Sequence, residues 1–315
     1  RRVEAGSARD PAGRAPVRER SPTRSGYALS SVDGSPIFYT LNGREPPGET
    51  PTVVLSDGIG CDGFVWKYLQ PRLAGRGPVL HWHYRGHGRT PPPRDRDRVA
   101  IADLADDLRS LLDECQIDRA VLFGHSMGVQ VSLETFRRHR DRVSGLVLVC
   151  GSPGQPLKTF HGSDRLEYLL PRLRGLVRSA PWLFNRLSRA VLPTRVSYAV
   201  AKVLEINGDL LAERDFMPYL RGLSRVESTL FFDMLSAANQ HSARDLLGAV
   251  DVPTLIVAGG RDGMTPPALS REMHGAIPRA ELLMIDDGSH TAPLERPEAT
   301  GQAIEDFLDR RIIHP

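Results

Sequence analysis

The sequence lacks the features of several protein classes, beginning with long apolar runs. None of its 315 residues lies in an uninterrupted apolar segment that approaches the roughly eighteen residues of a membrane-spanning helix. We therefore expect no integral membrane segment. Cysteine is equally sparse, and the three cysteines, Cys61, Cys115 and Cys150, are widely spaced without a Cys-x-x-Cys motif. An odd number in this pattern predicts reduced thiols in a reducing compartment rather than a disulfide framework.

Excess positive charge is absent outside the N-terminus. Residues 1–24 contain seven arginines against Glu4, Asp10 and Glu19, a sum of +4, whereas the whole chain is +3, so the remaining residues sum to −1. We therefore expect no nucleic-acid-binding surface. Residues 1–24 are rich in Arg, Pro, Ser and Gly and almost free of large apolar side chains, which predicts a disordered tail. A targeting peptide is the alternative, although the apolar core of a secretory signal is missing. Otherwise we expect a cytoplasmic protein.

The most informative motif present is a Gly-x-Ser-x-Gly pentapeptide, residues 124–128, directly after the apolar run 120–123. Residues 129–140 follow with apolar side chains at helical spacing, which predicts a helix. A serine at a sharp turn between a strand and a helix needs a glycine two residues to each side. Ser126 is therefore a candidate nucleophile. The amide of Met127, at the start of the helix, would be available to an oxyanion.

Two further segments carry an acid and a histidine in similar positions. Residues 252–258 form a short apolar run typical of a strand buried on both faces, and Asp262 lies in the loop that follows. Residues 266–277 then predict a helix and residues 281–285 another buried strand, after which comes His290. Open α/β sheets place their chemistry at such strand ends.

Serine, acid and histidine in this order resemble the α/β-hydrolase fold family from about residue 27 to residue 312. The resemblance implies a doubly wound, mostly parallel eight-stranded sheet with helices on both faces and an inserted helical cap. It also implies that Ser126 is the nucleophile, His290 the base and Asp262 the acid that orients the histidine. Asp286 and Asp287 precede His290 too closely to be its usual partner.

The oxyanion loop departs from the family. Where relatives usually carry His-Gly-x-Pro after the strand 52–55, this chain has Asp57 in place of the histidine and Gly60 in place of the proline. In the next strand and loop, where relatives carry an aspartate, this chain has His83. We therefore expect Asp57 and His83 to form an exchanged hydrogen-bonded pair that supports the loop. The amide of Ile59 is then the expected second oxyanion donor beside Met127.

The same segment permits an alternative of another class. His81, His83 and His87 resemble a metal-ligand cluster, with His81 and His83 on one face of a strand, and a metallohydrolase would use them. No further acidic or histidine ligand follows locally, and structural histidines are the usual finding at such positions. We therefore expect neither a metal nor another cofactor.

The remaining elements complete the predicted domain. Residues 27–31 and 37–41 flank Asp33-Gly34 as a hairpin. The other elements are expected at 64–73 and 98–115 (helices) and 143–150 (strand). Residues 154–245 show Leu, Arg and aromatic residues at helical spacing, which predicts a helical cap between core segments 25–153 and 246–315. Its prolines are expected to break it into short pieces, at Pro171, Pro181, Pro193 and Pro218. Most cap aromatics should hold the cap together, with some lining an apolar pocket, among them Trp182, Phe184, Phe216, Phe231 and Phe232.

A serine at position 126 excludes the haloalkane dehalogenase and epoxide hydrolase relatives, which use an aspartate there. The leading interpretation is hydrolysis of a small-molecule carboxylic ester with an apolar acyl group, lipid-like or otherwise, through an acyl-enzyme. Lactone, thioester, amide or carbon–carbon bond hydrolysis and cofactor-free perhydrolase or haloperoxidase activity use the same three groups. A binding protein that retains the fold without turnover is the alternative from another class.

Overall fold

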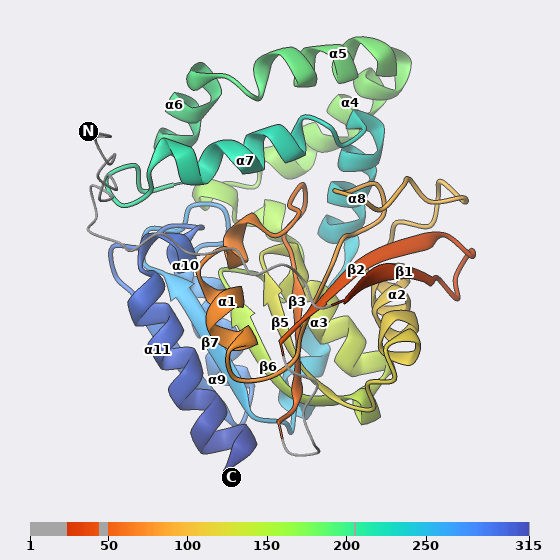
Figure 1. Cartoon of the computed structure of the whole chain (residues 1–315). Helices are drawn as coiled ribbons and strands as arrows, with labels where there is room; N and C mark the ends of the chain where they lie inside the picture. Colours follow the sequence, from red (N-terminus) through yellow and green to blue (C-terminus); the bar gives the residue numbers. More distant parts are fainter. Residues whose placement is uncertain (1–23, 44–49, 205, 315) are drawn as a thin grey trace, which may run out of the picture.

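The computed structural model describes residues 24–43, 50–204 and 206–314. Apart from Arg24, the predicted tail lies outside the described residues. One sheet runs through the molecule (Figure 1). Its strands are β1 (Arg24–Leu29), β2 (Pro36–Asn42), β3 (Thr52–Ser56), β4 (Val79–Trp82), β5 (Ala120–His125), β6 (Val143–Val149), β7 (Thr254–Gly259) and β8 (Ala280–Ile285).

The strand order is β1-β2-β4-β3-β5-β6-β7-β8. The hairpin of β1 and β2 is antiparallel, as predicted, and β2 pairs antiparallel with β4, whereas β4, β3, β5, β6, β7 and β8 are parallel. The predicted fold class is confirmed. Because parallel strands end at one edge of a sheet, the loops after β5, β7 and β8 meet there.

Helices cover both faces of the sheet because its central strands are apolar at most positions, on both faces. Along β5, Leu122 packs in the core beside α2 and α3, while Val121 and Phe123 point to the opposite core. One face carries α2 (Ile101–Glu114), α3 (Met127–Arg138) and α9 (Pro267–Ala276). The other carries α1 (Leu69–Ala74), α10 (Ala292–Glu295) and α11 (Pro297–Leu308). Short turns complete the chain at η1 (Phe64–Trp66), η2 (Arg140–Arg142), η3 (Pro156–Lys158), η4 (Phe160–Gly162), η5 (Arg244–Ala249) and η6 (Asp309–Ile313).

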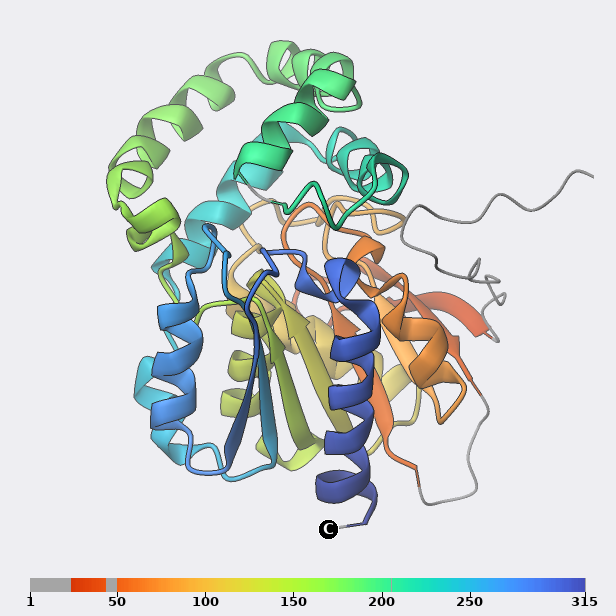
Figure 2. The same ribbon diagram turned by 90° about the vertical axis from the view of Figure 1, so that its left-hand side faces the viewer.

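Five helices lie between β6 and β7 and stand over one edge of the sheet (Figures 1 and 2). They are α4 (Arg165–Ser179), α5 (Pro181–Val191), α6 (Arg195–Leu204), α7 (Glu213–Leu223) and α8 (Ser228–Gln240). Pro181 begins α5 and Pro193 separates α5 from α6, as expected. The prediction was wrong for Pro171 and Pro218, which lie inside α4 and α7. A proline removes one helical hydrogen bond, and packing of the amphipathic face can outweigh that loss.

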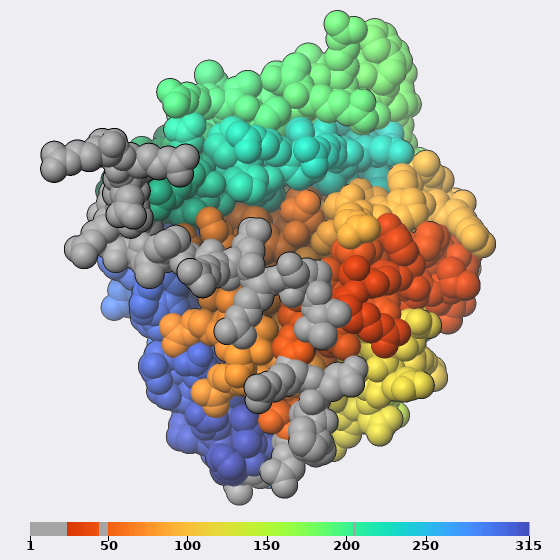
Figure 3. Space-filling model, viewed as in Figure 1, coloured from red at the N-terminus to blue at the C-terminus, as the bar shows by residue number. Residues whose placement is uncertain are grey.

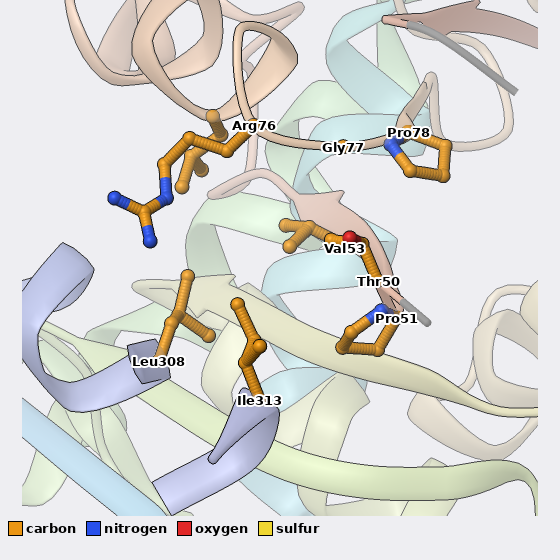
Figure 4. A pocket seen from close by; sticks show the side chains of 9 residues that line it. Thr50, Pro51, Val53, Arg76, Gly77, Pro78, Leu308 and Ile313 are labelled. Atoms are coloured by element: carbon orange, nitrogen blue, oxygen red, sulfur yellow. The ribbon is translucent and has the colours of Figure 1, made fainter. Parts of the chain in front are cut away.

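A small apolar crevice opens at the start of β3, at the opposite edge of the sheet from Ser126 (Figure 4). Its lining residues include Pro51, Val53, Leu308 and Ile313. Within the described ranges, no helix combines the length and apolar character that crossing a membrane requires.

Candidate active site

Ser126 occupies the sharp turn between β5 and α3. Its φ of 55° and ψ of −116° lie outside both the helical and the extended regions. A positive φ costs a residue with a Cβ atom of the order of 1–3 kcal/mol, so the surrounding structure must impose this conformation. The backbone N–H of Ser126 donates to the carbonyl of Val149 on the neighbouring strand, at 3.1 Å.

The glycines of the motif are required by close packing. A Cβ atom on Gly124 would lie 2.2 Å from the carbonyl oxygen of Gly128, and one on Gly128 would lie 2.3 Å from that of Ser56. Neither distance leaves room for a side chain. On the facing loop, a Cβ on Gly58 would lie 3.0 Å from the Cβ of Ser126. The turn is therefore pressed directly against the loop that follows β3.

Asp262 and His290 are brought together by the loops after β7 and β8. Nδ1 of His290 donates to Oδ2 of Asp262 at 2.9 Å, and both side chains are buried. Asp262 also accepts from the backbone N–H groups of Met264 and Thr265 and from the Thr265 hydroxyl. Because the ionised carboxylate can only accept, Nδ1 of His290 carries a proton and Nε2 is left to act as a base.

Burial would raise the pKa of Asp262. The charge of the His290 ring and the hydrogen bonds from His290 and Thr265 outweigh this effect and hold the pKa of Asp262 below its usual value of 3.8. Asp262 is therefore ionised at neutral pH, which is the state needed to orient a neighbouring imidazole.

His125 is a site residue that the sequence analysis did not single out. Its Nε2 donates to the backbone carbonyl of His290 at 2.9 Å, and the two rings lie 4.9 Å apart. Burial, together with the nearby His290, lowers the pKa of His125 from 6.5 to about 3, so the ring is neutral. His125 thus ties the turn of Ser126 to the His290 loop. The available signal was a histidine immediately before the motif serine.

The two amides expected to face an oxyanion, those of Ile59 and Met127, donate no hydrogen bond to any residue that the structure describes. Met127 is the first residue of α3, where a helical N–H has no partner within the helix. Ile59 lies in the loop after β3, next to Gly58, which packs closely against Ser126.

The expected pair of Asp57 and His83 was wrong. Oδ2 of Asp57 accepts from Nε2 of His81, two residues before His83, at 2.8 Å. His83 instead accepts the backbone N–H of Arg89 on Nδ1, at 2.8 Å, and its ring lies against Gly88. The physical reason is that β4 ends at Trp82, so position 83 already belongs to the following loop and closes that loop on itself.

Further groups after β4 also support the oxyanion loop. Nδ1 of His87 donates to the carbonyl of Arg85, and its Nε2 accepts the N–H of Gly60, both at 2.9 Å. The Tyr84 hydroxyl donates to the carbonyl of Asp57 at 2.7 Å. The predicted support thus exists, with His81 and His87 in place of His83.

These contacts also account for the histidines that suggested a metal. His81, His83 and His87 each use a ring nitrogen in a protein hydrogen bond. Burial lowers the pKa of His87, and burial together with His81 lowers that of His83 to about 3. Among residues 24–43, 50–204 and 206–314, no three His, Cys, Asp or Glu side chains are grouped so that they could hold a metal ion.

Helices α7 and α8 lie on the oxyanion loop. Gly60 has a φ of 77°, and a Cβ there would lie 2.5 Å from Leu223 and 3.6 Å from Phe231. The Phe64 ring stacks on Tyr219 of α7, with centroids 4.6 Å apart. Of the aromatic residues expected to line a pocket, Phe231 lies beside Gly60 of this loop. Phe216 is fully buried against Phe64 and Tyr219, and Trp182 is 70% exposed.

The His290 loop is held by a buried carboxylate. Glu295 accepts from the backbone N–H of Ser289 at 2.6 Å and from the hydroxyl of Thr291 at 2.9 Å. It also accepts the N–H of Asn207, which follows α6, at 2.8 Å, and the Asn207 side chain donates to the carbonyl of Asp287 at 2.9 Å. This network joins the chain after α6 to the loop that carries His290.

Comparison with known proteins agrees with this geometry. A family model described as the alpha/beta hydrolase fold matches residues 51–297. A putative carbamate hydrolase, RutD, of Caulobacter vibrioides is 26% identical over 291 residues, covering 89% of this chain and 97% of the relative. A pimeloyl-[acyl-carrier protein] methyl ester esterase of Neisseria meningitidis is 28% identical over 276 residues, covering 86% and 81%. The solved enol-lactonase of Burkholderia xenovorans LB400 superposes with a TM-score of 0.71 at 24% identity, covering 90% and 99%, and shows the shared fold.

Proposed function

Since the chain belongs to the α/β-hydrolase fold family, we propose that it is a serine-dependent hydrolase that cleaves a carboxylic ester of an apolar acyl group through an acyl-enzyme. The observation that carries the proposal is the strained turn at Ser126, whose glycines are fixed by contacts too close for any side chain. Such strain is maintained only where the rest of the structure imposes it, and it presents the hydroxyl at the edge of the sheet.

In the proposed reaction, Ser126 Oγ attacks the ester carbonyl while Nε2 of His290 takes the hydroxyl proton. Asp262 stabilises the resulting imidazolium through the 2.9 Å hydrogen bond. The amides of Met127 and Ile59 would bind the oxyanion of the tetrahedral intermediate. Return of the proton to the leaving alcohol yields the acyl-enzyme, and water activated by His290 then releases the acid and frees Ser126.

The proposed substrate class rests on two kinds of support. The curated relatives are described as hydrolases of a carbamate and of a methyl ester, which are both acyl–oxygen or acyl–nitrogen compounds open to attack by a serine. The side chains that reach the oxyanion loop from α7 and α8, Leu223 and Phe231, are apolar, which suits an apolar acyl group. We further propose that residues 154–245 act as a cap on a core formed by 25–153 and 246–315.

A fluorophosphonate probe tests the mechanism. Wild-type protein should be labelled covalently, and Ser126→Ala should abolish labelling. Ser152→Ala is the matched control, because Ser152 follows the adjacent strand β6 but its hydroxyl is bonded within its own loop, to Gly154. Absence of labelling in the folded wild type would favour a binding protein, and labelling that survives Ser126→Ala would place the nucleophile elsewhere.

A series of p-nitrophenyl esters of increasing acyl length tests the substrate class. Activity should rise with chain length and then fall as the space under the cap is filled. Phe231→Ala should move the optimum to longer chains, whereas Phe216→Leu, at a fully buried packing position, should leave the optimum in place. If Phe231→Ala has the same optimal acyl length as wild type, α8 does not bind the acyl group as proposed.

A further inference from the structure

The helices α4, α5 and α6 carry most of the exposed large apolar side chains in the described part of the chain. Ten of the twelve large apolar side chains that are exposed in the described part of the chain lie on α4, α5 and α6. They are Tyr168, Leu169, Leu176, Trp182, Leu183, Leu187, Val191, Val196, Val200 and Val203. The other two are Tyr27 and Leu29, on the hairpin strand β1. A group of exposed apolar side chains of this size usually marks an interaction site.

These helices have apolar faces that the rest of the described chain does not cover. α5 packs against α4 and α8, and α6 packs against α7, yet α5 has no fully buried residue. On α6, Val196, Val200 and Val203 follow the i, i+4, i+7 spacing of one helical face, and Val203 is 81% exposed. In Figure 3 the region of α5 and α6, coloured light green, forms the outermost surface at the top of the molecule.

The same helices concentrate the positive charge. Residues 165–204 contain seven arginines and Lys202 against the single acid Glu167, a sum of +7, whereas the whole chain is +3, so all other residues together carry −4. Some of the arginines are neutralised, since Arg174 and Arg178 pair with Asp233 and Arg195 with Glu213. Those without an ion pair to a described residue are Arg165, Arg172, Arg186 and Arg189, together with Lys202.

We propose that α4, α5 and α6 form a docking surface for an anionic lipid bilayer. Apolar side chains and Trp182 would enter the boundary between headgroups and acyl chains, and the arginines would contact anionic headgroups, as in interfacial amphipathic helices. A second copy of the chain fits this surface poorly, because a symmetric contact would place the four arginines unpaired within the described chain and Lys202 of one copy against those of the other. An acidic protein would satisfy the arginines, but it would need a matching apolar surface as wide as three helices.

Vesicle binding tests the proposal without any use of catalysis. The protein should sediment with phosphatidylcholine vesicles that contain phosphatidylglycerol, and less with phosphatidylcholine alone, and added salt should weaken binding. Trp182 supplies a direct signal: Trp66 and Trp82 are fully buried, so a blue shift of tryptophan emission on binding should come from Trp182 and disappear in Trp182→Phe. Ser126→Ala should bind like wild type, so failure of docking and failure of the proposed hydrolase activity are distinguishable.

Variants locate the surface. Arg186→Glu with Arg189→Glu should weaken the partition to anionic vesicles by about fivefold per arginine or more. Val200→Glu with Val203→Glu should abolish the blue shift. Leu29→Glu is the matched control, since Leu29 is 68% exposed but lies on β1, and it should bind like wild type. All variants alter exposed positions, and circular dichroism checks that each is folded.

Three results would overturn the proposal. The first is wild-type protein that stays in solution with anionic vesicles at low salt. The second is loss of binding in Leu29→Glu with binding retained in the cap variants. The third is a different occupant: a wild-type dimer that the cap variants convert to monomers in sedimentation, or binding to a purified acidic carrier protein in the absence of any binding to vesicles.

Discussion

Acid should destabilise this protein through histidines that folding keeps neutral, and His125 is the clearest of them. Burial, with the adjacent His290, lowers the pKa of His125 from 6.5 to about 3. Between these two values the unfolded chain binds a proton on His125 and the folded chain does not. The free energy of unfolding is therefore unaffected by this group above 6.5, and it decreases as the pH falls from 6.5 toward 3.

The size of the effect follows from linkage. Each such proton changes the free energy of unfolding by about 1.4 kcal/mol per pH unit. At about pH 5, roughly 1.5 units below the ordinary value, His125 therefore removes about 2 kcal/mol of stability. His83, whose pKa is about 3 because of burial and the nearby His81, should remove a similar amount. Together they reach about 4 kcal/mol, a large part of the roughly 5–15 kcal/mol that stabilises a typical domain.

Urea unfolding at several pH values between about 7.5 and 5 measures this slope. His125→Gln should be less stable than wild type at neutral pH. Its free energy of unfolding should nevertheless fall less steeply as the pH is lowered, because unfolding then takes up about one proton fewer. Trp66→Phe is the control. Trp66 packs edge-on against His125, so this substitution removes packing around the histidine without removing a titrating group. Asp262 does not interfere, since its stabilisation persists above 3.8 and is lost only at lower pH. Equal slopes for wild type and His125→Gln would refute the reasoning.

Three further substitutions test the site. Asp262→Asn should lower kcat on a p-nitrophenyl ester by about 10⁴-fold, because an amide at this position favours the wrong tautomer of His290; an unchanged kcat would contradict the assignment. His87→Phe removes the acceptor of the Gly60 N–H and should lower kcat about tenfold or more with little change in KM, because the oxyanion loop is loosened rather than the substrate contacts. An effect on KM alone would argue against this role. Glu295→Gln turns one accepting oxygen into a donor facing other donors and should cost about 3 kcal/mol in a urea titration. If the Glu295→Gln variant were as stable as wild type, the network would contribute nothing to stability.

The sequence was sufficient for the order of strands and helices because those elements depend on patterns along the chain. Buried parallel strands are built from nearly continuous apolar runs, and the runs at 120–123, 143–150 and 252–258 all form strands. The helix expected at 98–115 was observed as α2, with its apolar positions buried. The helix expected at 64–73 is instead η1 followed by α1, with a break between them.

Side-chain pairing at the ends of strands could not be predicted in the same way. Asp57 directly follows β3, while His81 lies in the neighbouring strand β4 and His83 in the loop after it. A shift of two residues in the partner of Asp57 changes no apolar pattern along the chain. The choice of His81 depends on where β4 ends and on the backbone N–H of Arg89, which satisfies His83. The exchange of acid and histidine relative to the family was therefore visible in the sequence, whereas the identity of the pair was not.

The predicted cap, residues 154–245, illustrates a second limit of the same kind. Apolar residues at helical spacing predict a helix with one buried face, but they do not specify what buries it. Phe216 of α7 fulfils the expectation within the chain, because Phe64 and Tyr198 pack against it. Trp182 and Val200 lie on amphipathic helices too, yet they remain exposed. The amphipathic pattern is the same for the buried and the exposed residues. The difference in their exposure therefore comes from the positions of α4, α5 and α6, which stand over one edge of the sheet. The apolar faces of these helices, which the described part of the chain leaves uncovered, are therefore the reason for proposing a partner surface outside the molecule.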